Sequence, residues 1–194
     1  MAKANGPKYV VSLKRRRARL TDYSQRVNLL KSGKSRFVVR KTGKHVIVQL
    51  STHTDKGDKI LTQVNSKELL KYKWPERCNS PSAYLAGFLC AKKAAKEKIT
   101  EAVLDIGLQK ASKGNLIFSA VKGAIDGGLS IPMPEDMAAA GRMNGEHIAA
   151  YAKAIKGTDK YEKQFSSYLK EKVDPEKLPE LFEKVKKEIG GSNA

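Results

Sequence analysis

The chain is organised around residues 14–45, whose last part predicts a β-hairpin: Arg36-Phe37-Val38-Val39-Arg40-Lys41-Thr42-Gly43-Lys44-His45. The apolar run after Arg36 is typical of a strand, and the dipeptide Thr42-Gly43 predicts a tight turn. A second apolar run, Val46–Leu50, follows directly; its alternation gives one fully apolar face and one mixed face. Because such a short link joins antiparallel neighbours, this stretch predicts the start of a sheet with one buried face.

Cations gather before and within this hairpin. Residues 1–41 hold 13 Lys and Arg against one acid, Asp22, whereas the rest of the chain holds 25 against 19. An arm of one charge sign repels itself until a polyanion neutralises it. Arginine also offers a planar fork of donors that suits phosphate, and Tyr9 and Tyr23 are candidates for stacking on exposed bases or for packing within the arm. The pattern predicts a nucleic-acid partner, with an anionic membrane surface as the weaker option.

The rest of the pattern alternates strands and helices. Residues 1–20 are expected to be irregular, and a helix capped by Thr21 or Asp22 is expected to end near Ser32. Three more strands are predicted, at Ile60–Asn65, Ala102–Gly107 and Leu129–Pro132. Later helices are predicted at Ser82–Lys96 (with Ser80 as cap and Pro81 at its first position), Asn115–Asp126, Asn144–Lys156 and after Asp174-Pro175.

This order indicates an α/β (mixed α+β) fold, a mixed sheet with flanking helices. We expect three parts: a basic arm with its short helix at 1–32, an α/β core domain at 33–157 and a helical C-terminal extension at 158–194. The last helix carries Leu178, Phe182 and Ile189 at helical spacing. That apolar face needs a partner, either the core or another protein.

Composition bounds the protein class. The chain has 194 residues, 40% of them hydrophobic, and a net charge of +18. No stretch approaches the roughly 20 apolar residues of a membrane span, and the first seven residues lack a signal peptide. Cys78 and Cys90 are too few for a disulfide framework and match no zinc spacing. We therefore expect a cytoplasmic protein without a membrane partner.

Catalytic and cofactor motifs are weak. Gly33-Lys34-Ser35 resembles the end of a phosphate-binding loop, but the required earlier glycine is replaced by Asn28. Asp105 ends a buried strand, where a metal-dependent nuclease places a carboxylate, although no further acids are suitably spaced. The three histidines share no ligand spacing, and His45 is the one placed to touch RNA. We predict no enzyme, cofactor, metal or small-molecule substrate.

Several stretches together resemble one family. They are Lys14-Arg15-Arg16-Arg17, Thr21-Asp22-Tyr23, Leu29-Leu30-Lys31-Ser32-Gly33-Lys34, Val38-Val39-Arg40-Lys41, Lys44-His45-Val46-Ile47, Ala83-Tyr84-Leu85-Ala86-Gly87, Glu101-Ala102-Val103-Leu104-Asp105-Ile106-Gly107-Leu108, Lys122-Gly123-Ala124 and Gly145-Glu146-His147-Ile148-Ala149. In this order, over roughly residues 6–157, the chain is similar to the archaeal and eukaryotic form of the large-subunit ribosomal protein that binds 5S ribosomal RNA. The loop 133–143 is less charged than that family leads one to expect, and the tail beyond Gly157 matches in general character.

The resemblance implies a non-catalytic fold with a ribonuclease-H-like outline and a place in the central protuberance of the large ribosomal subunit. Its implied partners are 5S rRNA, large-subunit rRNA and neighbouring ribosomal proteins, including the other 5S-binding protein. Carried over position by position, the implied RNA-binding residues are Lys14, Arg15, Arg16, Arg17, Arg19, Tyr23, Arg26, Lys34, Arg40, Lys41, Lys44 and His45. The short tail favours an archaeal source.

Two alternatives stay open from the residues themselves. A DNA-associated basic protein would use the same arm on duplex DNA. A metal-dependent nuclease would use Asp105, together with acids that the sequence does not cluster around it.

Overall fold

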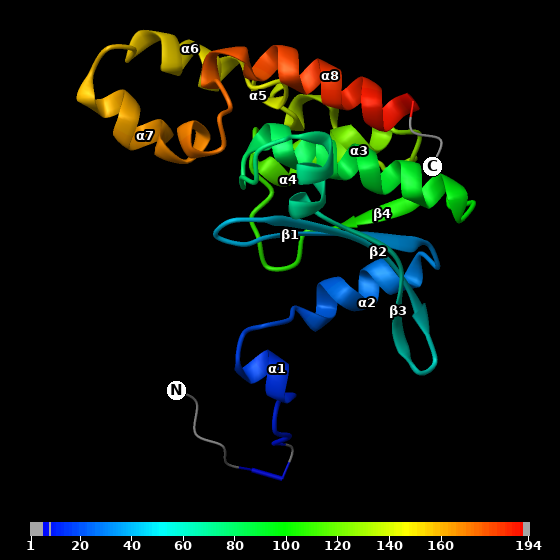
Figure 1. The fold of residues 1–194 in the computed structure, drawn as a ribbon. Coiled ribbons are helices and arrows are strands. Elements are labelled where there is room, and N and C mark those ends of the chain that lie inside the picture. Colours follow the sequence, from blue (N-terminus) through cyan, green and yellow to red (C-terminus); the bar gives the residue numbers. More distant parts are fainter. Residues whose placement is uncertain (1–5, 8, 192–194) are drawn as a thin grey trace.

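The computed structural model describes residues 6–7 and 9–191. Its centre is a four-stranded mixed sheet in the order β3-β2-β1-β4 (Figure 1). The first three strands are joined by short links and pair antiparallel: β1 (Ser35–Lys41), β2 (Val46–Thr54) and β3 (Gly57–Asn65). The fourth, β4 (Ala102–Asp105), follows a helix and pairs parallel with β1. The predicted mixed sheet with flanking helices is thereby confirmed.

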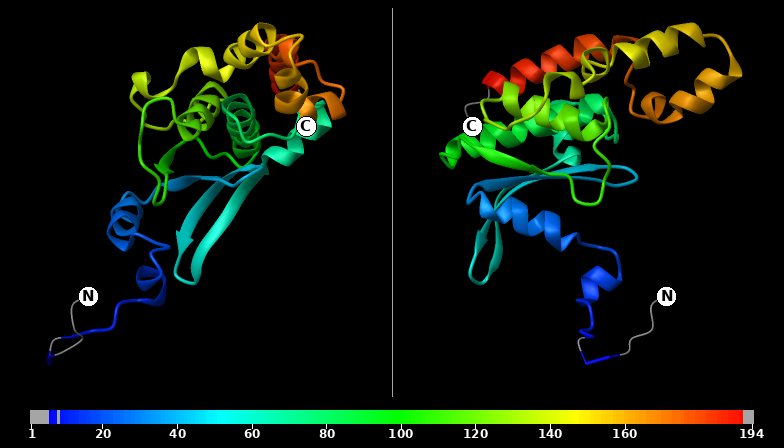
Figure 2. Two further views of the ribbon diagram at one scale, coloured as in Figure 1. Left: turned by 90° about the vertical axis from the view of Figure 1, so that its left-hand side faces the viewer. Right: turned by 180° about the vertical axis from the view of Figure 1, so that it is seen from behind.

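Helices cover one face of this sheet (Figure 2). α3 (Ser80–Lys96) is buried nearly all round and packs along α4 (Leu116–Asp126), while Phe37, Val39 and Val48 of the sheet face them with no exposed surface. Asparagines cap both helices, since Asn79 accepts from the amide of Ser82 and Asn115 from the amide of Ile117. The predicted Ser80 cap, with Pro81 at the first position, is therefore wrong by one position, because the helix already begins at Ser80 and the Asn79 side chain reaches forward to the first turn.

A second layer of helices follows in the C-terminal part. It contains η2 (Glu135–Met137), α5 (Ala140–Met143), α6 (Glu146–Ala154), α7 (Asp159–Lys170), η3 (Pro175–Lys177) and α8 (Leu178–Gly191). α8 packs on α3, and Phe182 lies edge-on to Trp74 at 6.2 Å and tilted against Tyr84 at 5.2 Å between ring centroids. Trp74 follows a 3-10 helix, η1 (Ser66–Tyr72). The apolar face of the last helix is therefore covered by the core of this chain.

Several predicted boundaries are corrected. The strand expected at Leu129–Pro132 is reduced to one parallel bridge between Glu101 and Ser130, because Pro132 lacks the amide that would extend it. The strand expected to reach Gly107 stops at Asp105, since Gly107 adopts a left-handed φ of +63°. The helix expected from Asn144 to Lys156 begins after Gly145 and ends at Ala154.

The arm lies on the face of the sheet opposite α3 and α4 (Figures 1 and 2). Asp22 caps α2 (Tyr23–Lys31) by accepting from two backbone amides, as predicted. The stretch expected to be irregular contains a one-turn helix, α1 (Lys14–Arg17), while residues 1–5 and 8 of that stretch lie outside the described residues. Among the described residues, none of the helices has the length and apolar character needed to cross a membrane.

Candidate nucleic-acid interface

The two faces of β1 carry different chemistry. Phe37 and Val39 point into the core, whereas Arg36 and Arg40 point to the opposite face, toward the arm. Between the arm and this face lies a polar cleft of about 310 Å³, lined by residues of both. The alternation of a strand therefore places cations opposite the apolar core and directly beneath the arm.

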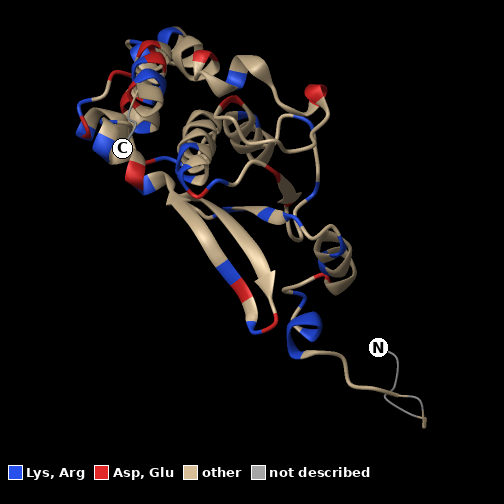
Figure 3. Ribbon diagram, turned by 90° about the vertical axis from the view of Figure 1, so that its right-hand side faces the viewer, with Lys and Arg blue, Asp and Glu red and all other residues tan. Residues whose placement is uncertain are grey.

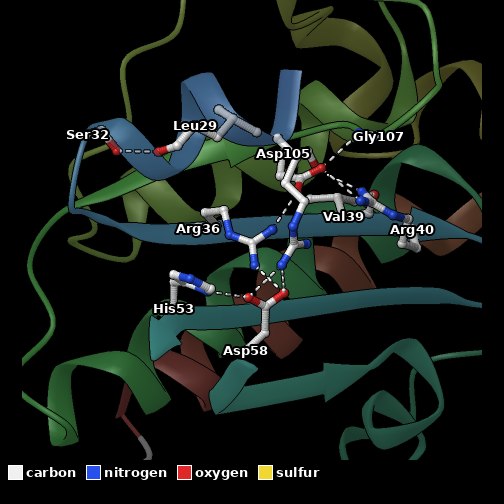
Figure 4. A network of polar contacts seen from close by, with 10 residues as sticks. Leu29, Ser32, Arg36, Val39, Arg40, His53, Asp58, Asp105 and Gly107 are labelled. Carbon is white, nitrogen blue, oxygen red and sulfur yellow. Dashed lines mark hydrogen bonds and ion pairs between the residues drawn. The ribbon is translucent and has the colours of Figure 1, made fainter. Parts of the chain in front are cut away.

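Three arginines and two aspartates alternate across this cleft, and Figure 4 labels Arg36, Arg40, Asp58 and Asp105 among them. Asp58 of β3 contacts Arg26 of α2 at 2.7 Å and Arg36 of β1 at 2.6 Å between the ion-paired atoms. Asp105, at the end of β4, contacts Arg36 at 3.1 Å and Arg40 at 2.8 Å. We call this row of five side chains the arginine–aspartate ladder. It connects the arm helix with three strands of the sheet.

Asp58 and the buried Arg36 depend on each other for their charge. Arg36 is 3% exposed, so its charge depends on the two carboxylates that pair with it. Burial raises the pKa of Asp58, but hydrogen bonds from Arg26, Arg36 and His53 outweigh burial and lower the pKa to about 2. Asp58 is therefore a carboxylate throughout the neutral range.

Asp105, the carboxylate on which the nuclease alternative depends, is part of the arginine–aspartate ladder. One oxygen of Asp105 accepts from Arg40 and from the amide of Gly107 at 2.8 and 2.9 Å, and the other accepts from Arg36. A metal ion would have to displace both arginines. Within the described part of the chain, no three His, Cys, Asp or Glu side chains gather in a metal-binding arrangement.

The exposed cations of the arm form one part of the predicted RNA surface (Figure 3). Lys14, Arg16, Arg17 and Arg19 are exposed and have no carboxylate partner among the described residues. Arg15 donates to the hydroxyl of Thr21 at 2.9 Å. Tyr23 is half-buried and borders a depression shared with Arg16 and Arg19.

The hairpin contributes a second group. Lys41 and Lys44 are exposed at the β1–β2 turn, again without a carboxylate partner among the described residues. In Figures 1 and 2 this turn lies toward the same side of the molecule as α1. The two groups are therefore able to face one extended polyanion.

Other predicted residues are engaged within the protein. Arg26 and Arg40 belong to the ladder, and Arg40 also donates to the carbonyl of Asp105 at 2.8 Å. Lys34 pairs with Glu101 at 2.5 Å, and His45 contacts Glu76 at 3.0 Å. These four side chains are paired with acids of the same chain, whereas the arm and the turn supply cations without such a partner among the described residues.

Sequence reasoning missed Arg36 and Asp58 as parts of this surface. Arg36 opens a buried strand, and an arginine at such a position signals a counter-charge elsewhere in the fold. Asp58 sits in a polar link with Asp55, where no local pattern distinguishes the two acids. Arg142 was missed as well; it borders a depression with Lys41 at the N-terminal ends of α3 and α4, which carry partial positive charge.

Known proteins are similar to this chain along nearly its whole length. Residues 7–101 and 92–134 match the family described as ribosomal large subunit proteins 60S L5 and 50S L18. The large ribosomal subunit protein uL18 of Thermofilum pendens is 47% identical over 194 residues, which cover 96% of this chain and 97% of that relative. The similarity therefore extends through the C-terminal helices as well as the arm and the sheet.

Proposed function

Since this chain belongs to the uL18 family of large ribosomal subunit proteins, we propose that it binds 5S rRNA and anchors it to large-subunit rRNA in the central protuberance. As a member of that family it is a structural constituent of the ribosome in the cytoplasm and has no enzymatic role. Its proposed protein neighbours include the other 5S-binding protein. The observation that supports this proposal is the group of exposed arm cations, which have no carboxylate partner among the described residues.

The proposed mechanism assigns different tasks to the two kinds of cation. Lys14, Arg16, Arg17 and Arg19 of the arm neutralise RNA phosphates, together with the lysines of the hairpin turn. Neutralisation releases counterions and supplies most of the affinity. The rigid sheet and the ladder set the spacing between the two groups, so the fit depends on the shape of a folded RNA. Arg15 and Tyr23 lie beside the arm cations and complete this surface.

Binding to purified 5S rRNA at a series of salt concentrations tests this function. For the full chain we expect a steep linear fall of log K with log salt. Each phosphate neutralised on duplex contributes a slope of roughly −0.9. The double variant R16Q/R17Q removes two exposed arm cations, so it should weaken binding and flatten the slope by about 2.

A matched control removes the same charge elsewhere. Lys184 and Lys187 are exposed residues of α8, a helix that lies on the far side of α3 from the arm (Figure 1). K184Q/K187Q should leave the slope nearly unchanged. A flat salt dependence for the full chain, or equal losses in the two double variants, would refute the proposed interface. Preference for duplex DNA in competition at equal salt would instead support a DNA-associated protein.

A further inference from the structure

We propose that Asp58 is a positioning residue for RNA binding: it clamps the arm helix to the sheet and so holds the arm cations ready for the RNA. This inference rests on the proposed function for its consequence, but the clamp itself is visible in the free protein. Arg26 of α2 and Arg36 of β1 converge on the single carboxylate of Asp58, at 2.7 and 2.6 Å (Figure 4).

The arm helix depends on this clamp because α2 buries little apolar surface. Every residue of α2, from Tyr23 to Lys31, keeps at least part of its surface exposed, and Val27 is 50% exposed. A nine-residue helix is marginal in water by itself, and apolar packing ordinarily supplies what is missing. With so little apolar burial, the contact of Arg26 Nη2 with both carboxylate oxygens of Asp58, at 2.8 and 2.7 Å, becomes a principal attachment of α2 to the sheet.

The clamp joins two residues that are far apart in the sequence. Asp58 lies 32 residues from Arg26 and stands on the β2–β3 hairpin, which projects beyond the sheet on the side of the arm. His53, its neighbour across the hairpin, adds a contact at 3.2 Å. The hairpin thus presents the carboxylate that holds the arm helix α2, and α1 lies just before α2 in the chain.

An acidic residue that promotes binding to a polyanion is unusual. The direction in which RNA affinity changes when Asp58 is removed therefore tests the proposed role. By simple electrostatics, removing Asp58 raises the net charge of +18 by one and should strengthen RNA binding. If Asp58 holds the arm in place, its removal instead leaves the arm to be ordered when RNA binds, and that cost reduces affinity. The two effects predict opposite changes.

The sheet should survive the substitution. When Asp58 is replaced, Arg36 still pairs with Asp105 at 3.1 Å, so the buried guanidinium keeps one counter-charge. Asp55 provides the matched control: it is exposed, lies on the same hairpin link and forms no ion pair with any described residue. D58A and D55A therefore change the charge equally, but D58A alone breaks the clamp. D58N serves as a milder second variant.

The first measurement needs no RNA. Limited trypsin digestion of the full-length proteins, read by mass spectrometry, reports cleavage after Arg26 and Lys31 within α2. We expect D58A to be cut there about tenfold faster than wild type, because a released helix unfolds locally, and D55A to match wild type. D58N should lie between them. Equal rates in all four proteins would overturn the clamp.

The second measurement uses 5S rRNA. D58A should bind about tenfold more weakly than wild type, and D55A equally well or slightly more tightly. The loss should also shrink when the arm is already disabled, so adding D58A to R16Q/R17Q should cost clearly less than adding it to wild type. Tighter binding by D58A, or strictly additive losses, would overturn the positioning role. If wild type fails to bind 5S rRNA while trypsin distinguishes D58A, the clamp stands and the proposed function fails.

Discussion

Replacing Gly87 by alanine tests the contact on which the helical layer is built. A Cβ atom at this position of α3 would lie 1.9 Å from the carbonyl oxygen of Ala120 in α4. Ordinary contacts begin at 3.4 Å, so the two helices would have to separate by about 1.5 Å along a buried interface. In an open helix the same substitution stabilises by about 1 kcal/mol.

The cost follows from what has to move. The obstructing atom is helix backbone, which cannot rotate aside as a side chain does, so overpacking should reach the upper end of its usual range, about 3 kcal/mol. For a chain of this size, that loss lowers the melting temperature by roughly 6–12 °C. Thermal unfolding followed by the fluorescence of Trp74, which is fully buried, measures it.

The control is Gly190 in α8, where a Cβ would meet its nearest neighbour, Phe88, at 3.9 Å. G190A should melt at or above the wild-type temperature. A G87A protein that melts as high as G190A would show that α3 and α4 do not pack as closely as the structure has them.

Two further predictions concern the tail and the ladder. F182A should destabilise the whole chain by about 3–5 kcal/mol in a single transition, because Phe182 is 3% exposed between Trp74 and Tyr84. A separate early transition that leaves Trp74 fluorescence unchanged would instead show that α8 unfolds independently. L169A is the control, because Leu169 of α7 is 43% exposed. The folded-state pKa of Asp58, about 2 against an ordinary 3.8, lies below the unfolded one, so its contribution to stability is present above pH 4 and is lost as pH falls toward 2. Urea unfolding between pH 5 and pH 2 should accordingly show a shallower loss of stability in D58N than in wild type, and parallel curves would contradict the assignment.

Local patterns predicted much of the fold because local physics produces it. The apolar runs beginning at Phe37 and Val46, with Thr42-Gly43 between them, specify a hairpin without help from the rest of the chain. Asp22 and Asn115 cap helices through amides two or three residues away. The helix between the third strand and β4 correctly indicated parallel pairing, since a long crossover is required for it.

The predictions that failed concern contacts between residues that are far apart in the sequence. The sequence pattern predicted the amphipathic last helix but not the residues on which it packs, because Trp74 and Tyr84 lie about a hundred residues away in the sequence. The expected strand at Leu129–Pro132 has a strand-like composition, yet the hydrogen bonds available to it depend on where Glu101 lies. The predicted division at residue 157 stays a proposal, which the F182A experiment addresses.

The sequence by itself determined that this protein carries a dense cluster of cations, with the single acid Asp22, ahead of a strand, because charge and hydrophobic alternation are properties of neighbouring residues. Only the tertiary structure decided which of those cations remain available. Arg26 and Arg40 read like the other basic residues, but the fold brings Asp58 and Asp105 against them from other strands. Arg16, Arg17 and Lys44 meet no such carboxylate among the described residues. Ion pairing acts through space, so the division between fixed and available cations appears when the strands are assembled.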